Sequence, residues 1–318
     1  MHFLRPCLQS LGEQTVEHEI VVVDNGSTDG TVAWLRDAMP AARVINLPHN
    51  LGFAGGNNAG LRAARGDMLV LLNNDTLAAP DFLASIAAPM DADAELGSVA
   101  GVLTFAHRPQ IVAAAGIVPG RDGVHREALA LTSTQALPLE PVHVFGATGG
   151  AVCLRRGALE DVGLFDERYF NYLEDADLAW RLRLRGWACA LAPAARVRHI
   201  YSATSGHQSP LKQRLLALNR WRVLLRCMPD ELLWEYVAAI LRYDLLAIAY
   251  ATVTRTPAIA QGRISLVREL PRLLAERKVI ARRSVVSASE LRRWFGPAQG
   301  IRQTLAETKR LDRLLADR

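Results

Sequence analysis

Short apolar runs alternate with helical patterns over the first part of the chain. Residues 19–24, 43–47 and 67–72 are apolar runs of strand length, and each is followed by polar, turn-forming residues. Residues 31–38 and 57–64, between these runs, carry a helical pattern. Strands that alternate with helices predict an α/β fold with a parallel, doubly wound sheet. Ligands of such sheets bind beyond the carboxyl ends of the strands, so the polar turns are the first places to look for chemistry.

The pattern is less regular over residues 97–145 and becomes sharp again after them. Residues 145–156 predict a glycine-rich turn that enters a strand, and residues 188–200 predict a further strand. Between them, residues 174–187 predict a helix whose first turn is acidic, which complements the helix dipole. From about residue 210 onward the pattern predicts helices only.

One of the C-terminal segments is apolar enough to raise the question of a membrane. Residues 231–253 are long enough to cross a bilayer, but Arg242 and Asp244 interrupt the run. The sequence therefore favours a packed or membrane-surface amphipathic helix over a spanning one. Residues 263–318 predict further basic amphipathic helices.

Length and charge divide the chain into two parts. Its 318 residues, half of them hydrophobic, allow one large domain with an appendage, predicted as residues 1–205 and 206–318. The last 116 residues, 203–318, carry 21 Lys/Arg against 10 Asp/Glu, whereas acids outnumber bases before them. Basic segments bind nucleic acid or anionic membranes. This one lacks interleaved aromatic residues and nucleic-acid-binding motifs, so we expect no nucleic acid and an anionic membrane surface as the partner.

The cysteines and the N-terminus indicate the compartment. None of the four cysteines belongs to a CxxC pair, so we expect buried free thiols and no disulfide framework or structural zinc site. The N-terminus lacks a basic start followed by an apolar run, which is the pattern of a secretory signal. A cytoplasmic location is predicted, with possible peripheral attachment to the inner face of the cell membrane.

The Asn73-Asn74-Asp75 turn is the first candidate for chemistry. It follows the third apolar run and offers a carboxylate and two amides, the hard oxygen ligands that Mg²⁺ or Mn²⁺ prefers. Taken alone, the triplet is better explained as a polar turn in which Asp75 caps a helix.

Two further loops strengthen this candidate. Asp24 ends the first apolar run, where its carboxylate could accept a hydrogen bond from a pyrimidine base or a ribose hydroxyl; the alternative is an ordinary Asx-turn. Residues 49–60, HNLGFAGGNNAG, pair small residues with amides where a loop enters a helix, which suits close approach to a nucleotide. Three such loops at successive strand ends are stronger evidence than any one of them.

The fourth candidate is the acidic start of the 174–187 helix. A carboxylate there could act as the general base that in-line attack by a hydroxyl needs. Glu174, Asp175 and Asp177 point in different directions around the helix, so one of them faces a cleft. The alternative is capping of the helix N-terminus, which fits Asp177 well.

Five stretches, in this order, resemble glycosyltransferase family 2, and above all its bacterial rhamnosyl- and galactofuranosyltransferase-like branch. They are VVVDNGSTDGT, NLGFAGGNNAG, LVLLNNDT, GGAVCLRR and VGLFDERYFNYLEDADLAWRLRLRGW. The resemblance covers roughly residues 4–205. It implies a GT-A fold, which is Rossmann-like with a mostly parallel central sheet flanked by helices. It also implies inverting transfer from a nucleotide-diphospho-sugar, dTDP- or UDP-linked, to a saccharide or polyprenyl-linked acceptor in cell-envelope polysaccharide synthesis.

The resemblance also assigns roles to residues. Asn74 and Asp75 match the last positions of the family's metal-binding Asp-x-Asp-like motif, and Asp175 matches the catalytic base of the Glu174-Asp175 pair. His199 matches a histidine that completes the metal site in some relatives; from its position alone it could equally be a surface or core histidine. The residues implied to bind the nucleotide-sugar are Asp24, Asn25, Asn50, Gly55, Gly56, Asn57 and Asn74.

The sequence departs from the family pattern at two places. Asn73 stands where a carboxylate is often found, and fewer negative charges should weaken metal binding. The family also begins with an apolar strand, whereas this chain starts within the helix that follows that strand. We therefore expect the sheet to lack its first strand and to have unpaired backbone groups beside the gap. The alternative function is an inactive nucleotide-sugar-binding or scaffold homologue.

Overall fold

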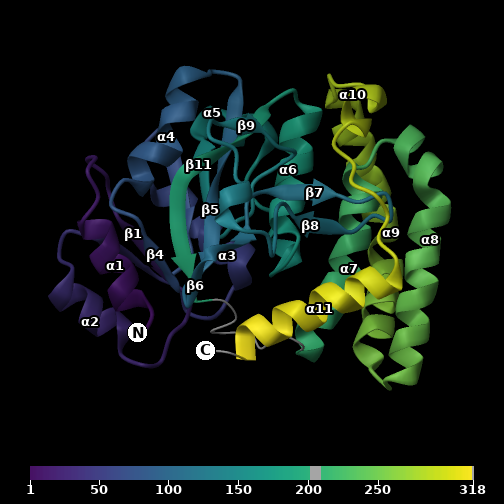
Figure 1. Ribbon diagram of the computed structural model, residues 1–318, viewed down its shortest axis with the longest axis horizontal. Coiled ribbons are helices and arrows are strands. Elements are labelled where there is room, and N and C mark those ends of the chain that lie inside the picture. Colours follow the sequence, from purple (N-terminus) through teal and green to yellow (C-terminus); the bar gives the residue numbers. More distant parts are fainter. Residues whose placement is uncertain (201–208, 317–318) are drawn as a thin grey trace.

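The computed structural model describes residues 1–200 and 209–316, and in these residues it combines three β-sheets with helices (Figure 1). The predicted domain boundary at residues 205/206 lies outside the described residues. The elements of the first half are α1 (Leu4–Gly12), β1 (Val21–Asp24), α2 (Thr31–Ala38), β2 (Arg43–Asn46), α3 (Gly52–Ala63), β3 (Met68–Leu72), β4 (Thr76–Ala78), α4 (Phe82–Ala92), β5 (Leu96–Phe105), β6 (Arg108–Ala114), β7 (Ile117–Pro119), β8 (His125–Glu127) and β9 (Val142–His143).

The second half contains the last strands and a group of long helices. These elements are β10 (Ala151–Arg155), α5 (Arg156–Val162), α6 (Glu174–Leu184), β11 (Ala188–His199), α7 (Pro210–Cys227), α8 (Asp230–Val253), α9 (Pro257–Arg283), α10 (Ala288–Arg292) and α11 (Ile301–Ala316). The predicted α/β class with a C-terminal helical extension is confirmed.

The central sheet is mixed, and in this respect it differs from the mostly parallel sheet that the sequence predicts. Its strands follow the order β3-β10-β5-β11-β4, with β6 beside β5 and β9 beside β11. The β5–β11 pair is parallel, but β10 is antiparallel to both of its neighbours. The reason is that the long connection from β5 to β10, residues 106–150, reverses the direction of the chain before β10 enters between β3 and β5.

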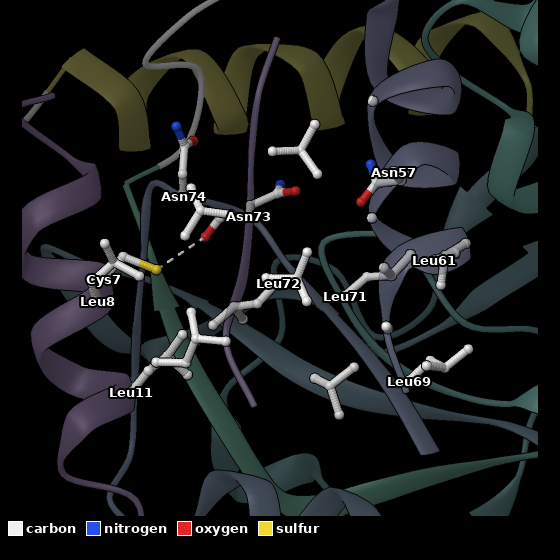
Figure 2. Close-up of a pocket in the computed structure, with 18 of the residues that line it drawn as sticks. Cys7, Leu8, Leu11, Asn57, Leu61, Leu69, Leu71, Leu72, Asn73 and Asn74 are labelled. Carbon is white, nitrogen blue, oxygen red and sulfur yellow. Dashed lines mark hydrogen bonds between the residues drawn. The ribbon is translucent and has the colours of Figure 1, made fainter. Parts of the chain in front are cut away.

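The sheet is interrupted between β1 and β3, as the sequence predicts. Strand β1 pairs with β2 in a separate two-stranded parallel sheet, and β3 pairs with β10. Within the described residues each of the two strands has one edge without a partner strand. Both edges line a cavity of about 770 Å³, which α1 and α3 also line (Figure 2).

The C-terminal helices share a hydrophobic core with the sheet-containing part. Trp180 of α6 and Phe145 pack in one buried cluster with Val223 and Leu224 of α7. Helix α9 in turn packs along α7, and α8 lies on the outside of both (Figure 1). All four cysteines are buried free thiols, as predicted.

Candidate active site

The loop after β1 is held in place by its own side chains. Asp24 is buried, and its Oδ2 accepts a hydrogen bond from the Ser27 backbone N–H at 3.1 Å, which is the geometry of an Asx-turn. Asn25 donates from Nδ2 to the Gly52 carbonyl at 2.9 Å and accepts at Oδ1 from the Leu51 N–H at 2.8 Å. Asn25 therefore ties this loop to the start of α3.

The start of α3 needs glycines for close packing. Gly52 has φ +72°, and a Cβ there would lie 2.2 Å from the Phe170 carbonyl oxygen. A Cβ on Gly56 would lie 3.0 Å from Nδ2 of Asn25, and one on Gly55 would lie 2.6 Å from the Leu51 Cβ. The small residues of this segment thus let the β1 loop and α3 approach each other.

Two predicted ligand-binding amides in this segment make local hydrogen bonds. Asn50 is exposed, and its Oδ1 accepts from the Gly52 N–H at 2.8 Å. Asn57 is half-buried on α3, and its Nδ2 donates to the Phe53 carbonyl at 2.9 Å. Each keeps part of its amide available for a further partner.

Most of the predicted nucleotide-binding residues gather at one end of the cavity between β1 and β3. In Figure 2 the asparagine side chains lie at the upper end of this cavity, and leucine side chains from α1, α3 and β3 lie below them. The predicted residues that line the cavity are Asp24, Asn25, Gly56, Asn57 and Asn74. The carboxyl ends of β1 and β3 thus form one polar rim, although the two strands belong to different sheets.

The structure brings Asp75 and His199 together. Asp75 is buried just before β4, and His199 is the last residue of β11, which pairs with β4. His199 Nε2 lies 3.1 Å from Asp75 Oδ1. A carboxylate and an imidazole suit a divalent cation, and Mg²⁺ sites commonly take the remaining ligands from substrate phosphates. Among the described residues no group of three His, Cys, Asp or Glu could hold a metal ion, so a cation here needs ligands from the donor.

Asp175 lies at a glycine-rich turn. Its Oδ2 accepts from the Gly149 N–H at 3.1 Å and lies 3.4 Å from the Thr148 hydroxyl, while its Oδ1 accepts from the Ala176 N–H at 2.8 Å. Burial raises the pKa of Asp175, and these donors oppose the rise because they stabilise the carboxylate. A half-buried carboxylate of raised pKa, held by three donors, is suited to accept a proton.

The same turn connects Asp175 to the Asn73-Asn74-Asp75 segment. Gly149 binds Asp175, and the carbonyl of the next residue, Gly150, accepts a hydrogen bond from the Asn73 N–H at 3.1 Å. A Cβ on Gly149 would lie 2.8 Å from the Phe53 ring. The Asp175 carboxylate and the backbone at the start of the 73–75 turn are therefore hydrogen-bonded to two successive glycines.

The other two acids of the 174–177 segment occupy different environments. Glu174 is buried with no hydrogen-bond partner at Oε2, and burial together with the charge of Asp175 raises its pKa well above the usual range. Asp177 is also buried, but it binds Arg181 at 2.8 Å and Arg226 at 2.5 Å. Burial opposes its ionisation, and these two arginines outweigh that effect and lower the pKa of Asp177. Asp177 is therefore an ion-pair partner that links α6 to α7, rather than the simple helix cap considered from the sequence.

Sequence reasoning missed several residues of this site. Thr148 and Gly149 contact Asp175 from a loop that the sequence marks only as glycine-rich. Glu127 Oε1, from β8, also lies 3.4 Å from the Thr148 hydroxyl. Although solvent reaches Glu127, the surrounding atoms and the charge of Asp175 raise its pKa. No signal in the sequence pointed to Glu127, because 48 residues separate it from Asp175.

Known proteins identify the family. Residues 2–163, just over half of the chain, match the family described as Glycosyl transferase family 2. The chain belongs to glycosyl transferase family 2. The matched segment of this family 2 protein includes Asp24 and the 73–75 turn, whereas Asp175 and His199 lie beyond it.

Relatives of this family 2 protein include a bacterial rhamnosyltransferase and a bacterial O-antigen biosynthesis protein. It is 30% identical over 211 residues to the N-acetylglucosaminyl-diphospho-decaprenol L-rhamnosyltransferase of Mycobacterium tuberculosis. This alignment covers 59% of this chain and 68% of that protein. It is 29% identical over 217 residues to the O-antigen biosynthesis protein RfbC of Myxococcus xanthus, and this alignment covers 63% of this chain and 16% of that protein. The predicted rhamnosyltransferase-like branch is thereby confirmed.

A solved structure supports the predicted fold. The crystal structure of GalNAc-T7 with UDP, GalNAc and Mn²⁺ superimposes with a TM-score of 0.57 at 15% sequence identity. The match covers 80% of this chain and 55% of that chain. The GT-A fold predicted from the sequence is confirmed.

Proposed function

We propose that this family 2 protein transfers a sugar from a nucleotide-diphospho-sugar to an acceptor hydroxyl with inversion, and that Asp175 is the general base. The observation that carries the proposal is the Gly149-Gly150 turn. Its Gly149 N–H binds the Asp175 carboxylate, and its Gly150 carbonyl accepts from the backbone N–H of Asn73, the first residue of the 73–75 turn. A base and a diphosphate site at one turn are the arrangement that in-line attack on an anomeric carbon requires.

The proposed chemistry divides between two groups of side chains. The polar rim with Asp24, Asn25 and Asn57 binds the nucleotide, and Asn74 lies beside the diphosphate. Asp175 takes the proton of the acceptor hydroxyl as that oxygen attacks the sugar from the face opposite the leaving nucleotide. Glu174 is buried beside it, and burial together with the charge of Asp175 raises the pKa of Glu174, so the neutral form of Glu174 is favoured next to the Asp175 carboxylate.

We assign the metal site to Asp75 and His199. His199 Nε2 and Asp75 Oδ1 lie 3.1 Å apart, where β11 ends beside the start of β4. An imidazole and a carboxylate both suit Mg²⁺ or Mn²⁺ as ligands. When bound, the cation neutralises the charge that develops on the leaving nucleoside diphosphate. With one carboxylate in the 73–75 turn, the site depends on oxygens of the donor.

The proposed partners follow from the relatives and the charge of the chain. The mycobacterial relative is named for a decaprenol-linked acceptor, which supports a polyprenyl-linked or other saccharide acceptor here, with a dTDP- or UDP-sugar as donor. A role in cell-envelope polysaccharide synthesis agrees with both relatives. The excess of bases after residue 203 supports cytoplasmic action at the inner face of an anionic membrane.

The substitution Asp175→Asn tests the base assignment. We expect turnover to fall by roughly 10²–10⁴-fold, because the amide cannot take a proton, while nucleotide affinity stays near that of the unmodified protein. Release of nucleoside diphosphate is measured with a panel of UDP-, dTDP- and GDP-sugars in Mg²⁺ or Mn²⁺, and nucleotide binding is measured by calorimetry.

The substitution Glu160→Gln, at an exposed glutamate of α5, serves as the control and should change neither measurement. Unchanged turnover in the Asp175→Asn protein would remove Asp175 from the role of base. Addition of EDTA should abolish turnover, and added Mn²⁺ or Mg²⁺ should restore it.

The open edges of β1 and β3 favour one alternative, a nucleotide-sugar-binding protein without turnover. The nucleotide rim spans these two strands, and no strand joins them within the described residues. Binding of a nucleotide by calorimetry together with no release of nucleoside diphosphate from any donor would establish this alternative.

A further inference from the structure

Helix α8 exposes a continuous apolar face. It is the one described helix that is long and apolar enough to cross a membrane, yet only 17% of its most apolar window is buried. Trp234 is 72% exposed and Leu245 is 69% exposed. Large exposed side chains recur along it at separations of seven, four and three residues, which places them on one face of a helix: Trp234, Leu241, Leu245 and Ile248.

Helix α9 continues the exposed apolar surface. It is joined to α8 by residues 254–256, and α8 lies at the edge of the molecule with α9 between it and the sheet-containing part (Figure 1). Its large exposed apolar side chains are Ile264, Val267, Leu270, Leu274 and Val279. We call α8, α9 and their connection the α8–α9 hairpin. Exposed apolar surface of this extent marks a site of interaction.

The charges of the hairpin favour an anionic partner. All three acids between residues 236 and 283 are in ion pairs: Asp244 with Arg220 and Arg263, Glu269 with Arg222, and Glu276 with Arg168, Arg226 and Arg272. Five exposed bases of the same segment have no ion-pair partner in the described part of the chain: Arg242, Arg255, Arg268, Lys278 and Arg282. The exposed acids of the hairpin, Asp230, Glu231 and Glu235, lie in the first turns of α8, so the outer surface from residue 236 onward is apolar and positively charged.

The same ion pairs hold α8 against the protein. Asp244, at the middle of α8, accepts from Arg220 of α7 at 2.9 Å and from the Trp221 indole at 2.6 Å. Insertion of α8 across a bilayer would break these bonds and place Asp244 in hydrocarbon, which is costly. The helix can instead lie flat, with its apolar side chains in the bilayer interface and its arginines at the lipid headgroups.

We propose that the outer face of the α8–α9 hairpin docks on an anionic lipid bilayer and lies parallel to its surface. This inference deepens the proposed action on a polyprenyl-linked acceptor, because it names the surface that brings the protein to such an acceptor. The purpose of docking rests on the proposed function, whereas docking itself requires no sugar transfer.

Vesicle co-sedimentation with the full chain tests the proposal. We expect binding to phosphatidylcholine vesicles that contain phosphatidylglycerol, and much weaker binding to pure phosphatidylcholine vesicles. The double substitution Leu241→Glu/Leu245→Glu should lower binding by more than about tenfold, because it places two carboxylates in the apolar face. The matched control is Leu139→Glu. Leu139 is 96% exposed in the loop before β9, outside the α8–α9 hairpin, so this variant should bind vesicles as the unmodified protein does.

The arginines provide an independent arm. The triple substitution Arg242→Gln/Arg268→Gln/Arg282→Gln should weaken binding to anionic vesicles by about fivefold for each base removed and leave the weak binding to neutral vesicles unchanged. All of these side chains are exposed, so circular dichroism should show the same fold in every variant.

Two outcomes would overturn the proposal. One is equal vesicle binding by the Leu241→Glu/Leu245→Glu and Leu139→Glu proteins. The other is self-association of the full chain that the double substitution abolishes, with no vesicle binding, which would make a second copy the partner of this face. Nucleoside diphosphate release, measured in the same samples without lipid, reports separately on the proposed sugar transfer.

Discussion

At the scale of single residues, the two neighbours Glu174 and Asp175 differ in how they are stabilised. Asp175 has three donors at its carboxylate, whereas Glu174 is buried with an unpartnered Oε2. The protein therefore opposes ionisation of Glu174 more strongly than ionisation of Asp175. Environments that separate the protonation of adjacent carboxyls are typical of acid–base sites.

The pH dependence of stability follows from Glu174. Its pKa is raised in the folded state, so the protonated form stabilises the fold below the ordinary glutamate pKa of about 4.3. As pH rises above this value, Glu174 ionises in the unfolded chain but not yet in the folded protein. The stabilisation is therefore lost progressively between the unfolded and the folded pKa. We expect Glu174→Gln to be more stable than the unmodified protein, by a margin that grows with pH.

Urea unfolding at about pH 5 and about pH 7 measures this margin. The same substitution at the exposed Glu160 controls for the loss of a carboxyl group. A margin for Glu174→Gln that stays constant between the two pH values would contradict the assignment.

At the scale of elements, the contact between α6 and α7 connects the candidate active site to the C-terminal helices. Asp177 is fully buried on α6 and binds Arg226 of α7 as well as Arg181 of its own helix. Arg226 also lies 3.1 Å from Asp166 and from Glu276 of α9. This network fixes the helix that carries Asp175 relative to two C-terminal helices.

Removal of the Asp177 charge should therefore destabilise the whole fold. Asp177→Asn removes the shared partner of the buried Arg181 and the half-buried Arg226, and we expect a loss of about 3–5 kcal/mol in the free energy of unfolding. Asp230→Asn is the matched control, because Asp230 is 74% exposed and its pair with Arg277 should contribute about 0–1 kcal/mol. Chemical denaturation of both variants gives the comparison, and equal losses would refute a structural role specific to the buried pair.

At the scale of the whole molecule, the interruption between β1 and β3 divides the fold into units of unequal size. The β1–β2 sheet has a small core of its own, with Leu4, Leu8, Val22 and Leu35, whereas the central sheet packs between two much larger clusters. Side chains of the small unit link it to the larger part. Glu19 accepts from the Gly66 N–H at 3.3 Å, Ser10 Oγ accepts from the Ala78 N–H at 3.1 Å, and Gln14 Nε2 donates to the Ala79 carbonyl at 2.8 Å.

Hydrogen exchange should reveal this division. We expect the amides of β1 and β2 to exchange faster than those of β10 and β5, because a small unit opens at lower free energy than a central sheet. Exchange measured by mass spectrometry on the folded chain tests this. Equal protection of β1 and β10 would mean that the two sheets open as one cooperative unit.

The local pattern of the sequence predicts most of the elements and the polar turns at the strand ends. The helix at residues 31–38 has the predicted bounds, and strands β1, β2 and β3 lie within one or two residues of the predicted ones. Apolar periodicity and turn residues act over short distances, so a single sequence reports them well. The antiparallel entry of β10 was missed because strand direction depends on where distant segments return to the sheet.

The same division holds for the site. The sequence by itself determined the residue types and their order, from Asp24 through the 73–75 turn to the Glu174-Asp175 pair. Only the tertiary structure decided that His199 lies against Asp75, that Asp175 is held by Gly149, and that Asp177 is taken up by Arg181 and Arg226. The physical reason is that donors, charges and burial come from residues far apart in the chain, and these set which carboxylate can accept a proton.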